Sequence, residues 1–425
     1  MRELVPLLLY ADDLILISTT AKGLQRQLDA LASFCQARQL DVNHSKTKVV
    51  IFETRRSNCQ DFIYEDTPVE RQDSYKYLGF TFHATKTMAY GVGFLVTAAK
   101  KAMHAMQRRC AFLRLTDPAV KCQLFDTLVL PILSYACEVW ATDPDLGQAC
   151  ETLHRQFLRQ LLGIRKTVTN EIPLAEFGRF PLQIHFWQQV LRYHNRATNL
   201  PHTRLVNLAL IDGLVEVSDQ WFDTYDSGTW RAELDTFLQV QPGKPETLQP
   251  FEVASIVNFQ QQLFNLSYRI NTGYSSLTLY RTIQTDHQYA MYLSAVKCYP
   301  YRRLISRFRC GCHGLRVDIG RFGINSLALT REQRFCEVCG TLSVEDEHHF
   351  LFECPAYDEV RNRHSELYQL PSADVGSFLA TQQHALLGRH LKKCFSIRQF
   401  RLRRPSIHLA TVFTAWTQLR RSELG

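Results

Sequence analysis

The sequence predicts an α+β protein in which a small strand-rich block precedes a mostly helical remainder, and three observations lead to this fold class. Two apolar runs, Leu4–Leu9 and Leu14–Ile17, flank the acidic pair Asp12–Asp13, a pattern typical of a β-hairpin. Beyond residue 84, apolar residues recur at helical spacing. Near the C-terminus, cysteines and histidines between Cys336 and Cys354 predict a small metal-binding lobe.

The composition narrows the class of protein. A typical domain size of about 150 residues predicts two to four folded units in this chain of 425 residues. The formal charge of +8 suits an anionic partner such as nucleic acid. Thirteen cysteines without a secretory signal favour reduced thiols and metal binding. No apolar run reaches the ~18 residues of a membrane span, so we expect a nuclear or cytoplasmic protein without a membrane partner.

The first element, the hairpin around Tyr10-Ala11-Asp12-Asp13, places two carboxylates at a bend. Adjacent side chains on a straight strand face opposite ways, whereas at a bend both can approach a hard cation such as Mg²⁺. Two acids are also ordinary turn residues, and this alternative stays open for the hairpin taken alone.

A helix, a strand and a second hairpin complete the block. Apolar residues at helical spacing predict an amphipathic helix packed on the sheet: Leu24, Leu28, Leu31 and Cys35. A polar turn from Leu40 to Lys48 leads into a strand over Val49–Phe52, and aromatic residues around Gly79 predict a hairpin over Ser74–Phe82.

This block resembles the catalytic palm of a reverse transcriptase of the non-LTR (LINE-type) retrotransposon class. Tyr10-Ala11-Asp12-Asp13 matches the catalytic box of that family. Asn43-x-x-Lys46-Thr47-Lys48 matches its next segment, and Tyr75-Lys76-Tyr77-Leu78-Gly79-Phe80 matches the primer-grip hairpin. Three boxes in the family's order are far more specific than any one of them.

The resemblance implies RNA-directed DNA synthesis with Mg²⁺, an RNA template and a DNA primer or target. Asp12 and Asp13 would be the catalytic metal-binding pair, and two metal ions would stabilise the attacking and leaving oxygens. Lys46 would lie near the incoming triphosphate, although alone it is more simply a solvated lysine on a turn. Contacts to the nucleic acid would come from Tyr10, Tyr77, Leu78 and Gly79.

One part of the family's site is not in this sequence. In the family, another metal-binding aspartate and the basic fingers precede the Tyr-Ala-Asp-Asp box, and only nine residues precede Tyr10 here. We therefore expect an N-terminally truncated reverse transcriptase whose magnesium site is incomplete and which does not polymerise by itself.

The next segment, residues 85–200, is predicted to be helical. Thr116-Asp117-Pro118 is a helix start, and Pro131 should kink the helix that follows. Another basic helix is expected over Leu153–Leu162. In the family this position holds the thumb, which grips the template–primer duplex. A row of basic residues suits phosphate contacts, or else a solvated helical face: Lys100, Lys101, Arg108 and Arg109.

Residues 201–300 carry little chemical signal and are predicted to be a helical connector. A proline- and glycine-containing stretch over 239–250 indicates a loop. Helical patterns resume over Phe251–Leu266 and Gln288–Val296.

The cysteine–histidine cluster predicts a zinc site. A Cys-x-x-Cys turn places two thiolates on one metal, and a later histidine and cysteine can complete a tetrahedron. The expected ligands are Cys336, Cys339, His349 and Cys354, which leaves His348 facing solvent or nucleic acid. Unpaired thiols beside a histidine-rich turn are the alternative. Cys310-Gly311-Cys312-His313 offers too few well-spaced ligands, and we interpret it as structural.

The flanks of this cluster resemble the zinc-knuckle region that follows the reverse transcriptase domain in the same retrotransposon class. A lobe of this kind aids template or target binding, and we expect it to use the basic residues around it: Arg303, Arg307, Arg309, Arg321 and Arg334. The segment from Arg389 to Arg404 predicts a basic helix, either solvated or in contact with nucleic acid.

These expectations combine into one organisation, an α+β chain with a partial palm, a helical thumb and connector, and a small zinc lobe. The predicted domains are a palm over 1–84, a thumb-like domain over 85–200, a connector over 201–300, a zinc-knuckle lobe over 301–365 and a basic tail over 366–425. The alternative function is a non-catalytic, zinc-dependent nucleic-acid-binding protein derived from such an element.

Overall fold

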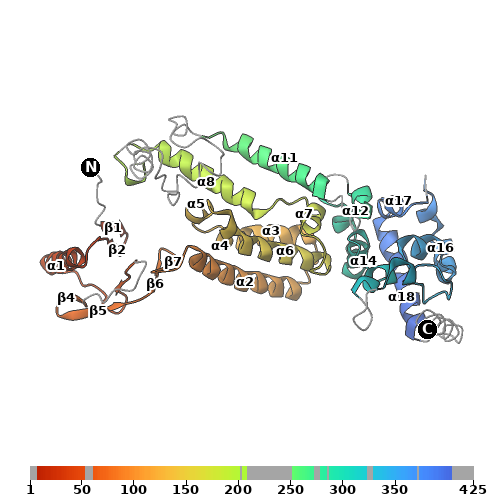
Figure 1. The fold of residues 1–425 in the computed structure, drawn as a ribbon, viewed down its shortest axis with the longest axis horizontal. Helices are drawn as coiled ribbons and strands as arrows, with labels where there is room; N and C mark the ends of the chain where they lie inside the picture. Colours follow the sequence, from red (N-terminus) through yellow and green to blue (C-terminus); the bar gives the residue numbers. More distant parts are fainter. Residues whose placement is uncertain are drawn as a thin grey trace, which may run out of the picture. The chain divides into compact units, whose positions relative to one another are not determined.

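The computed structural model describes residues 7–52, 61–201, 203–207, 251–271, 278–284, 287–322, 329–370 and 373–403 (Figure 1). The loop expected over 239–250 and the last residue of the expected basic helix, Arg404, lie outside the described residues. The chain divides into two compact units. The first comprises Met1–Ala102, Val129–Ala149 and His185–Val253, and the second comprises Met103–Leu128, Cys150–Ile184 and Ala254–Gly425. The α+β prediction is confirmed, since the named strands lie within residues 7–83 and helices dominate the rest of the described chain.

The N-terminal hairpin consists of β1 (Leu7–Tyr10) and β2 (Asp13–Leu16), which are antiparallel. Tyr10 pairs with Asp13, so Ala11 and Asp12 form the two-residue turn. Ala11 adopts a positive φ of 51°, which a tight turn of this kind requires. The predicted hairpin is therefore confirmed over its described residues, with the acidic pair at the bend.

Helix α1 (Ala21–Arg38) covers the next small sheet and confirms the predicted amphipathic helix. Thr20 caps it by accepting a hydrogen bond from the Gly23 amide at 3.1 Å. Leu28 packs in a core cluster with Val49, Phe62 and Tyr64. Each such apolar side chain contributes about 1.5–3 kcal/mol on burial, so this cluster holds helix and sheet together.

The sheet under α1 differs from the prediction in one respect. Strand β3 covers only Lys48–Val49, so the strand expected over Val49–Phe52 was wrong in its extent. The reason is its partner: β3 runs parallel to β5 (Thr67–Arg71), and only Glu70 and Arg71 pair with it. Strand β5 itself forms an antiparallel hairpin with β4 (Phe62–Tyr64), which the sequence pattern had not indicated.

The second predicted hairpin is confirmed as β6 (Ser74–Tyr77) and β7 (Phe80–His83), joined at Leu78-Gly79. It leads into the long helix α2 (Ala89–Phe112). Helix α3 (Pro118–Leu128) begins at the predicted Thr-Asp-Pro signal, where Asp117 accepts a hydrogen bond from the Ala119 amide at 2.8 Å. The helix ends at Leu128, and a new helix, α4 (Leu130–Leu133), carries Pro131 at its start. The single helix kinked at Pro131 that the sequence predicted is therefore two helices, with the proline in the first turn of the second, where it fits best.

The remaining helices follow in order along the chain. They are α5 (Cys137–Trp140), α6 (Gln148–Leu162), α7 (Glu171–Glu176), α8 (Leu182–Thr198), α11 (Val253–Asn271), α12 (Thr278–Ile283), α13 (Tyr292–Ala295), α14 (Tyr299–Arg309), α15 (Arg316–Ile319), α16 (Asp358–Arg363), α17 (Val375–Leu379) and α18 (His384–Arg403). Short 3₁₀ turns occupy Pro144–Gly147, Gly320–Phe322, Arg331–Gln333, Pro355–Tyr357 and Ser365–Tyr368. The helix expected over Gln288–Val296 is shorter than predicted and covers only Tyr292–Ala295. None of the described helices is long and apolar enough to cross a membrane.

A buried ionic cluster in the second unit joins α7 to α13 and α14. Arg309 donates to Glu176 at 3.0 Å, and the hydroxyl of Tyr292 donates to the other oxygen of this carboxylate at 2.5 Å. Burial lowers the pKa of Arg309, but the charge of Glu176 outweighs this effect and raises the pKa overall. Because Arg309 is only 6% exposed, the expectation that it contacts nucleic acid was wrong. Its charge is neutralised inside the fold.

Candidate metal centre and nucleic-acid interface

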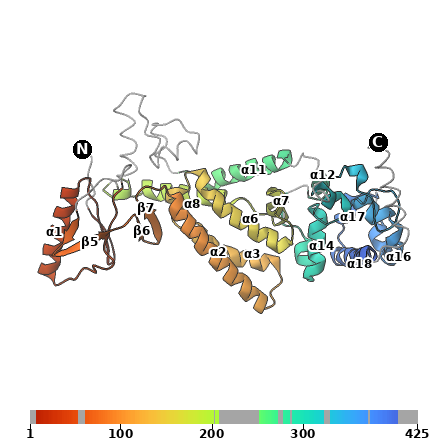
Figure 2. The same ribbon diagram turned by 60° about the horizontal axis from the view of Figure 1, so that its bottom comes forward.

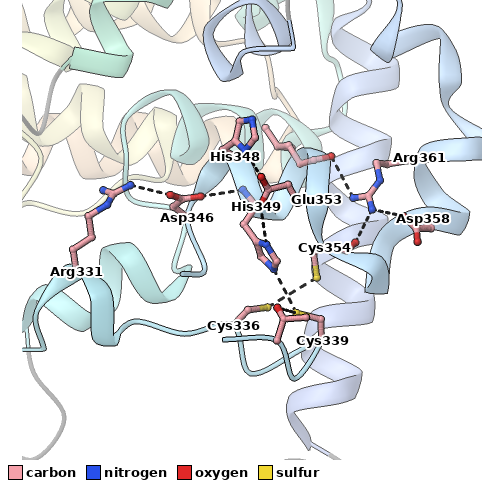
Figure 3. A network of polar contacts seen from close by, with 12 residues as sticks. Arg331, Cys336, Cys339, Asp346, His348, His349, Glu353, Cys354, Asp358 and Arg361 are labelled. Atoms are coloured by element: carbon pink, nitrogen blue, oxygen red, sulfur yellow. Dashed lines mark hydrogen bonds and ion pairs between the residues drawn. The ribbon is translucent and has the colours of Figure 1, made fainter. Parts of the chain in front are cut away.

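Four side chains from two segments of the second unit converge on one point (Figure 3). Their candidate ligand atoms all lie within 4.8 Å of one another, and the residues are Cys336, Cys339, His349 and Cys354. The Sγ atoms of Cys336 and Cys354 are 4.0 Å apart. The Sγ atom of Cys339 lies 3.4 Å from Nε2 of His349. The structure therefore brings together the four residues that the sequence pattern singled out.

The first two cysteines are held by a short hairpin-like loop. Phe335 and Val344 form an antiparallel bridge, and the Cys336 amide donates to the carbonyl of Ser343 at 2.8 Å. Gly340, directly after Cys339, has a φ of +72°, a conformation that favours glycine. The loop thereby folds back on itself and presents both sulfurs on one side.

The second pair of ligands is set by a π-helical turn over His349–Glu353. The Cys354 amide donates to the carbonyl of His349 at 2.8 Å, an i→i+5 hydrogen bond that brings these two residues to the same side. Asp346 caps the turn by accepting a hydrogen bond from the His349 amide at 2.9 Å, and it is fixed in turn by Arg331 at 2.8 Å. The spacing His-x4-Cys thus acquires its geometry from a specific local structure.

The separations fit a tetrahedral ion. Ligands bound at about 2.3 Å for sulfur and 2.0–2.1 Å for nitrogen lie about 3.5–3.8 Å apart around a tetrahedral zinc ion. The sulfur–sulfur distance of 4.0 Å and the sulfur–nitrogen distance of 3.4 Å are close to these values. Three of the residues are buried, and Cys339 is partly accessible. Three thiolates and one imidazole are a donor set that zinc prefers.

The electrostatics of the cluster also favour a cation. Hydrogen bonds from the neighbouring thiols of Cys336 and Cys354 hold the pKa of Cys339 well below its usual range. Hydrogen bonds to Cys336 and Cys339 raise the pKa of His349 to about 10. The cluster therefore stabilises a thiolate at Cys339, which is the form that binds metal. The hydrogen bonds with Cys339 and Cys354 raise the pKa of Cys336, and the pKa of Cys354 is raised to about 12, so metal binding at these two thiols releases protons.

Glu353 supports the histidine from outside the cluster. One of its carboxylate oxygens lies 3.3 Å from Nδ1 of His349, and the other lies 3.2 Å from Nδ1 of His348 (Figure 3). A carboxylate at Nδ1 leaves Nε2 to face the sulfurs, as outer carboxylates commonly do in metal sites. His348 is half-exposed and does not join the cluster. Sequence reasoning missed Glu353, although its position four residues after His349 was an available signal.

The acidic pair at the N-terminal hairpin is exposed. Asp12 lies in the turn and Asp13 begins β2, and both side chains face solvent. Among the described residues these two carboxylates form no cluster with a third metal-ligating side chain. Lys46 is also exposed, on a turn in which Asn43 accepts a hydrogen bond from the Lys46 amide at 3.2 Å.

The turn Leu78-Gly79 of the second hairpin is held by a residue far along the chain. The hydroxyl of Tyr135 donates a hydrogen bond to the carbonyl of Leu78. Leu78 and Gly79 have positive φ values of 44° and 89°, and a Cβ on Gly79 would lie 3.0 Å from the Tyr135 ring. Tyr10 and Leu78 are exposed, whereas Tyr77 is partly buried. Sequence reasoning had not identified this contact of Tyr135.

The basic residues of α2 lie on its solvent face. Lys100, Lys101, Arg108 and Arg109 are exposed, whereas Met103 and Met106 are buried. The helix therefore separates an apolar packing face from a basic face.

Comparisons with known proteins place these features in context. Residues 2–82 match the reverse transcriptase (RNA-dependent DNA polymerase) family. The chain is 28% identical over 167 residues to an uncharacterized transposon-derived protein of Caenorhabditis elegans; this match covers 38% of the chain and 58% of that relative's length. No solved structure matches the chain. Residues 2–82 are therefore similar to reverse transcriptases, and part of the chain is similar to a transposon-derived protein.

Proposed function

We propose that the chain acts within a non-LTR (LINE-type) retrotransposon reverse transcriptase, in which its zinc-held lobe binds nucleic acid near the polymerase site. The observation that carries this proposal is the Cys336, Cys339, His349 and Cys354 cluster, whose spacing fits tetrahedral zinc. The match of residues 2–82 to reverse transcriptases supports it from the other end of the chain. The proposal keeps the five domains predicted from the sequence, over residues 1–84, 85–200, 201–300, 301–365 and 366–425.

In this proposal the N-terminal hairpin supplies part of the nucleotidyl-transfer site. Asp12 and Asp13 offer carboxylate oxygens, the ligands that Mg²⁺ prefers, at an exposed turn. Bound magnesium would neutralise charge on the incoming triphosphate and on the leaving group. Lys46 would approach the triphosphate from its exposed turn. The Leu78-Gly79 turn, held by Tyr135, would position the primer end with Tyr10 and Tyr77.

The remaining contacts to nucleic acid are assigned to basic helices and the zinc lobe. Lys100, Lys101, Arg108 and Arg109 offer an exposed row of positive charge along α2, which suits the phosphates of an RNA template and its DNA primer. Zinc would hold the lobe in its folded form, and structural sites of this type contribute on the order of 10 kcal/mol.

A second candidate function is non-catalytic, zinc-dependent nucleic-acid binding. The observation that favours it is the exposed Asp12–Asp13 pair, which gains no third carboxylate among the described residues. Two-metal nucleotidyl transfer requires more ligands than this pair supplies. We therefore expect that the chain as given does not polymerise alone.

Two measurements on the full chain separate these functions. Primer extension with Mg²⁺ tests catalysis in the wild type, in Asp12→Ala and in Asp66→Ala, which alters an exposed acid in another hairpin turn. Incorporation that is lost only in Asp12→Ala would establish the polymerase and contradict our expectation of inactivity. Nucleic-acid binding, measured with zinc and after chelation, tests the lobe. Binding that is unchanged by chelation would refute a zinc-dependent role.

A further inference from the structure

Helix α18 has two chemically distinct faces. It packs against α14 in the second unit (Figures 1 and 2). Its apolar residues are buried: Leu387, Leu391, Cys394 and Phe395. Phe395 contacts Phe308 of α14 at a ring-centroid distance of 5.8 Å and Phe350 at 5.2 Å. The apolar side of the helix is thus already used for packing.

The opposite face is basic. Arg389, Lys392, Lys393 and Arg403 are exposed, with Ser396 and Gln399 between them. From His384 to Arg403 the helix contains no aspartate or glutamate. Within the described residues, none of the four cations forms a salt bridge. A helix rises about 1.5 Å per residue, so the cations from Arg389 to Arg403 span about 21 Å.

The same helix is fastened to the metal centre. Arg398 on its buried side makes two hydrogen bonds of 2.7 Å to Glu345, which lies between the two pairs of candidate ligands. Arg401 donates to the carbonyl of Val338 at 3.3 Å, inside the Cys336–Cys339 loop. The position of the basic face is therefore tied to the folded cysteine–histidine lobe.

We propose that the exposed face of α18, defined by Arg389, Lys392, Lys393 and Arg403, is a binding surface for the phosphate backbone of nucleic acid. This inference rests on the proposed function of the zinc lobe and names the element that makes its contact. A strand of duplex carries a phosphate about every 3.4 Å along the axis, so a 21 Å row spans about six phosphates. The row of cations therefore suits a partner whose negative charges repeat regularly along its length, as the phosphates of a nucleic-acid strand do.

The alternative anionic partner is a lipid surface, and the structure disfavours it. Helices that lie on membranes insert a broad apolar face into the lipid. In α18 that face is packed against α14 and the lobe, and Phe400 is the large apolar residue that remains exposed on the helix. Basic residues without an apolar face suit a phosphate backbone.

The test compares two double variants of the full zinc-loaded chain. Lys392→Gln/Lys393→Gln removes two charges from the α18 face. Lys166→Gln/Lys297→Gln removes two charges from exposed loop positions elsewhere in the same unit. Affinity for a 20-base-pair DNA duplex is measured by fluorescence anisotropy from 50 to 200 mM salt. Zinc content and circular dichroism verify that both variants are folded.

We expect the binding of the α18 variant to depend less steeply on salt than that of the wild type. Each phosphate contact contributes about 0.9 to the slope of log affinity against log salt, so two lost contacts reduce the slope by about 1.8. Between 50 and 200 mM salt, the fold-loss of affinity in the wild type should then be about 12 times the fold-loss in the variant. The control variant should retain most of the wild-type slope.

Each other outcome has a distinct meaning. If the wild type binds duplex but both variants have equal slopes, the α18 assignment is wrong while the proposed function stands. If the wild type binds no nucleic acid with or without zinc, the proposed function fails and this inference fails with it. Vesicles containing phosphatidylserine serve as a second probe. Binding to them that requires Lys392 and Lys393, without duplex binding, would overturn the proposal in favour of a membrane.

Discussion

The buried ion pair between Arg398 and Glu345 gives the sharpest test of how α18 is held. The side chains are only 9% and 1% exposed, and Glu345 also accepts a hydrogen bond from the Arg316 amide at 2.8 Å. Burial lowers the pKa of Arg398, but the hydrogen bonds and charge of Glu345 outweigh burial and raise it. Arg398→Met would keep the packed stem and leave the carboxylate buried without its cation.

The expected loss is about 3 kcal/mol, at the lower end of the 3–5 kcal/mol that breaking a buried pair costs, because the Arg316 amide still satisfies Glu345. Hydrogen exchange of peptides from α18 in the zinc-loaded chain measures this loss, and the exchange rate should increase about 150-fold. Glu345→Gln/Arg398→Met should recover part of the loss, because the uncompensated charge is removed.

The control is Arg363→Met, which breaks a pair with Glu359 at 2.7 Å between side chains that are 58% and 83% exposed. An exposed pair of this kind contributes less than about 0.5 kcal/mol. If Arg398→Met accelerated exchange no more than Arg363→Met, the buried pair would not hold α18 to the lobe, and our account of this contact would be refuted.

Three further predictions concern other sites. Cys354→Ser should abolish stoichiometric zinc binding in a metal analysis, whereas Cys298→Ser, at an exposed cysteine outside the cluster, should leave it intact; equal zinc contents would contradict the assigned ligands. Burial lowers the pKa of His390 from its ordinary value of 6.5 to about 3, so the folded state favours the neutral ring. The contribution of His390 to the free energy of unfolding is complete above pH 6.5 and is lost as the pH falls towards 3. At pH 5 this contribution is about 2 kcal/mol smaller. His390→Asn should abolish that portion of the acid sensitivity in denaturant titrations, and an unchanged pH profile would argue against it. Gly79→Ala should destabilise the first unit by about 1–2 kcal/mol in chemical denaturation because of its positive φ, whereas Gly93→Ala, in α2 with open space around it, should be neutral or stabilising; the reverse order would count against the strained turn.

Several features of this protein were determined by the sequence alone because their physical cause is local. Two apolar runs around two acids produce the β1–β2 hairpin. The start of α3 is set within the segment Thr116-Asp117-Pro118, where the side chain of Asp117 accepts a hydrogen bond from the amide of Ala119. The Cys336-x2-Cys339 spacing likewise indicated a metal loop, whose turn depends on the neighbouring Gly340. In each case the chain within a few residues supplies both the signal and the geometry.

Other features were decided only by the tertiary structure, because their partners are distant in the chain. Strand β3 ends at Val49 since its partner, β5, offers only two pairing residues. Tyr135 reaches the carbonyl of Leu78 across 57 positions. No periodicity or spacing encodes contacts of this kind.

Charge gives the clearest contrast between sequence and structure. Arg309 and Arg398 appear in the sequence as members of basic segments, yet each is buried against a carboxylate, 133 and 53 positions away. On the same helix as Arg398, the side chains of Arg389, Lys392 and Lys393 remain exposed. The sequence determines how many cations each segment carries. Only packing determines which of them are neutralised inside the fold, because burying a charge is tolerated only where a distant partner meets it.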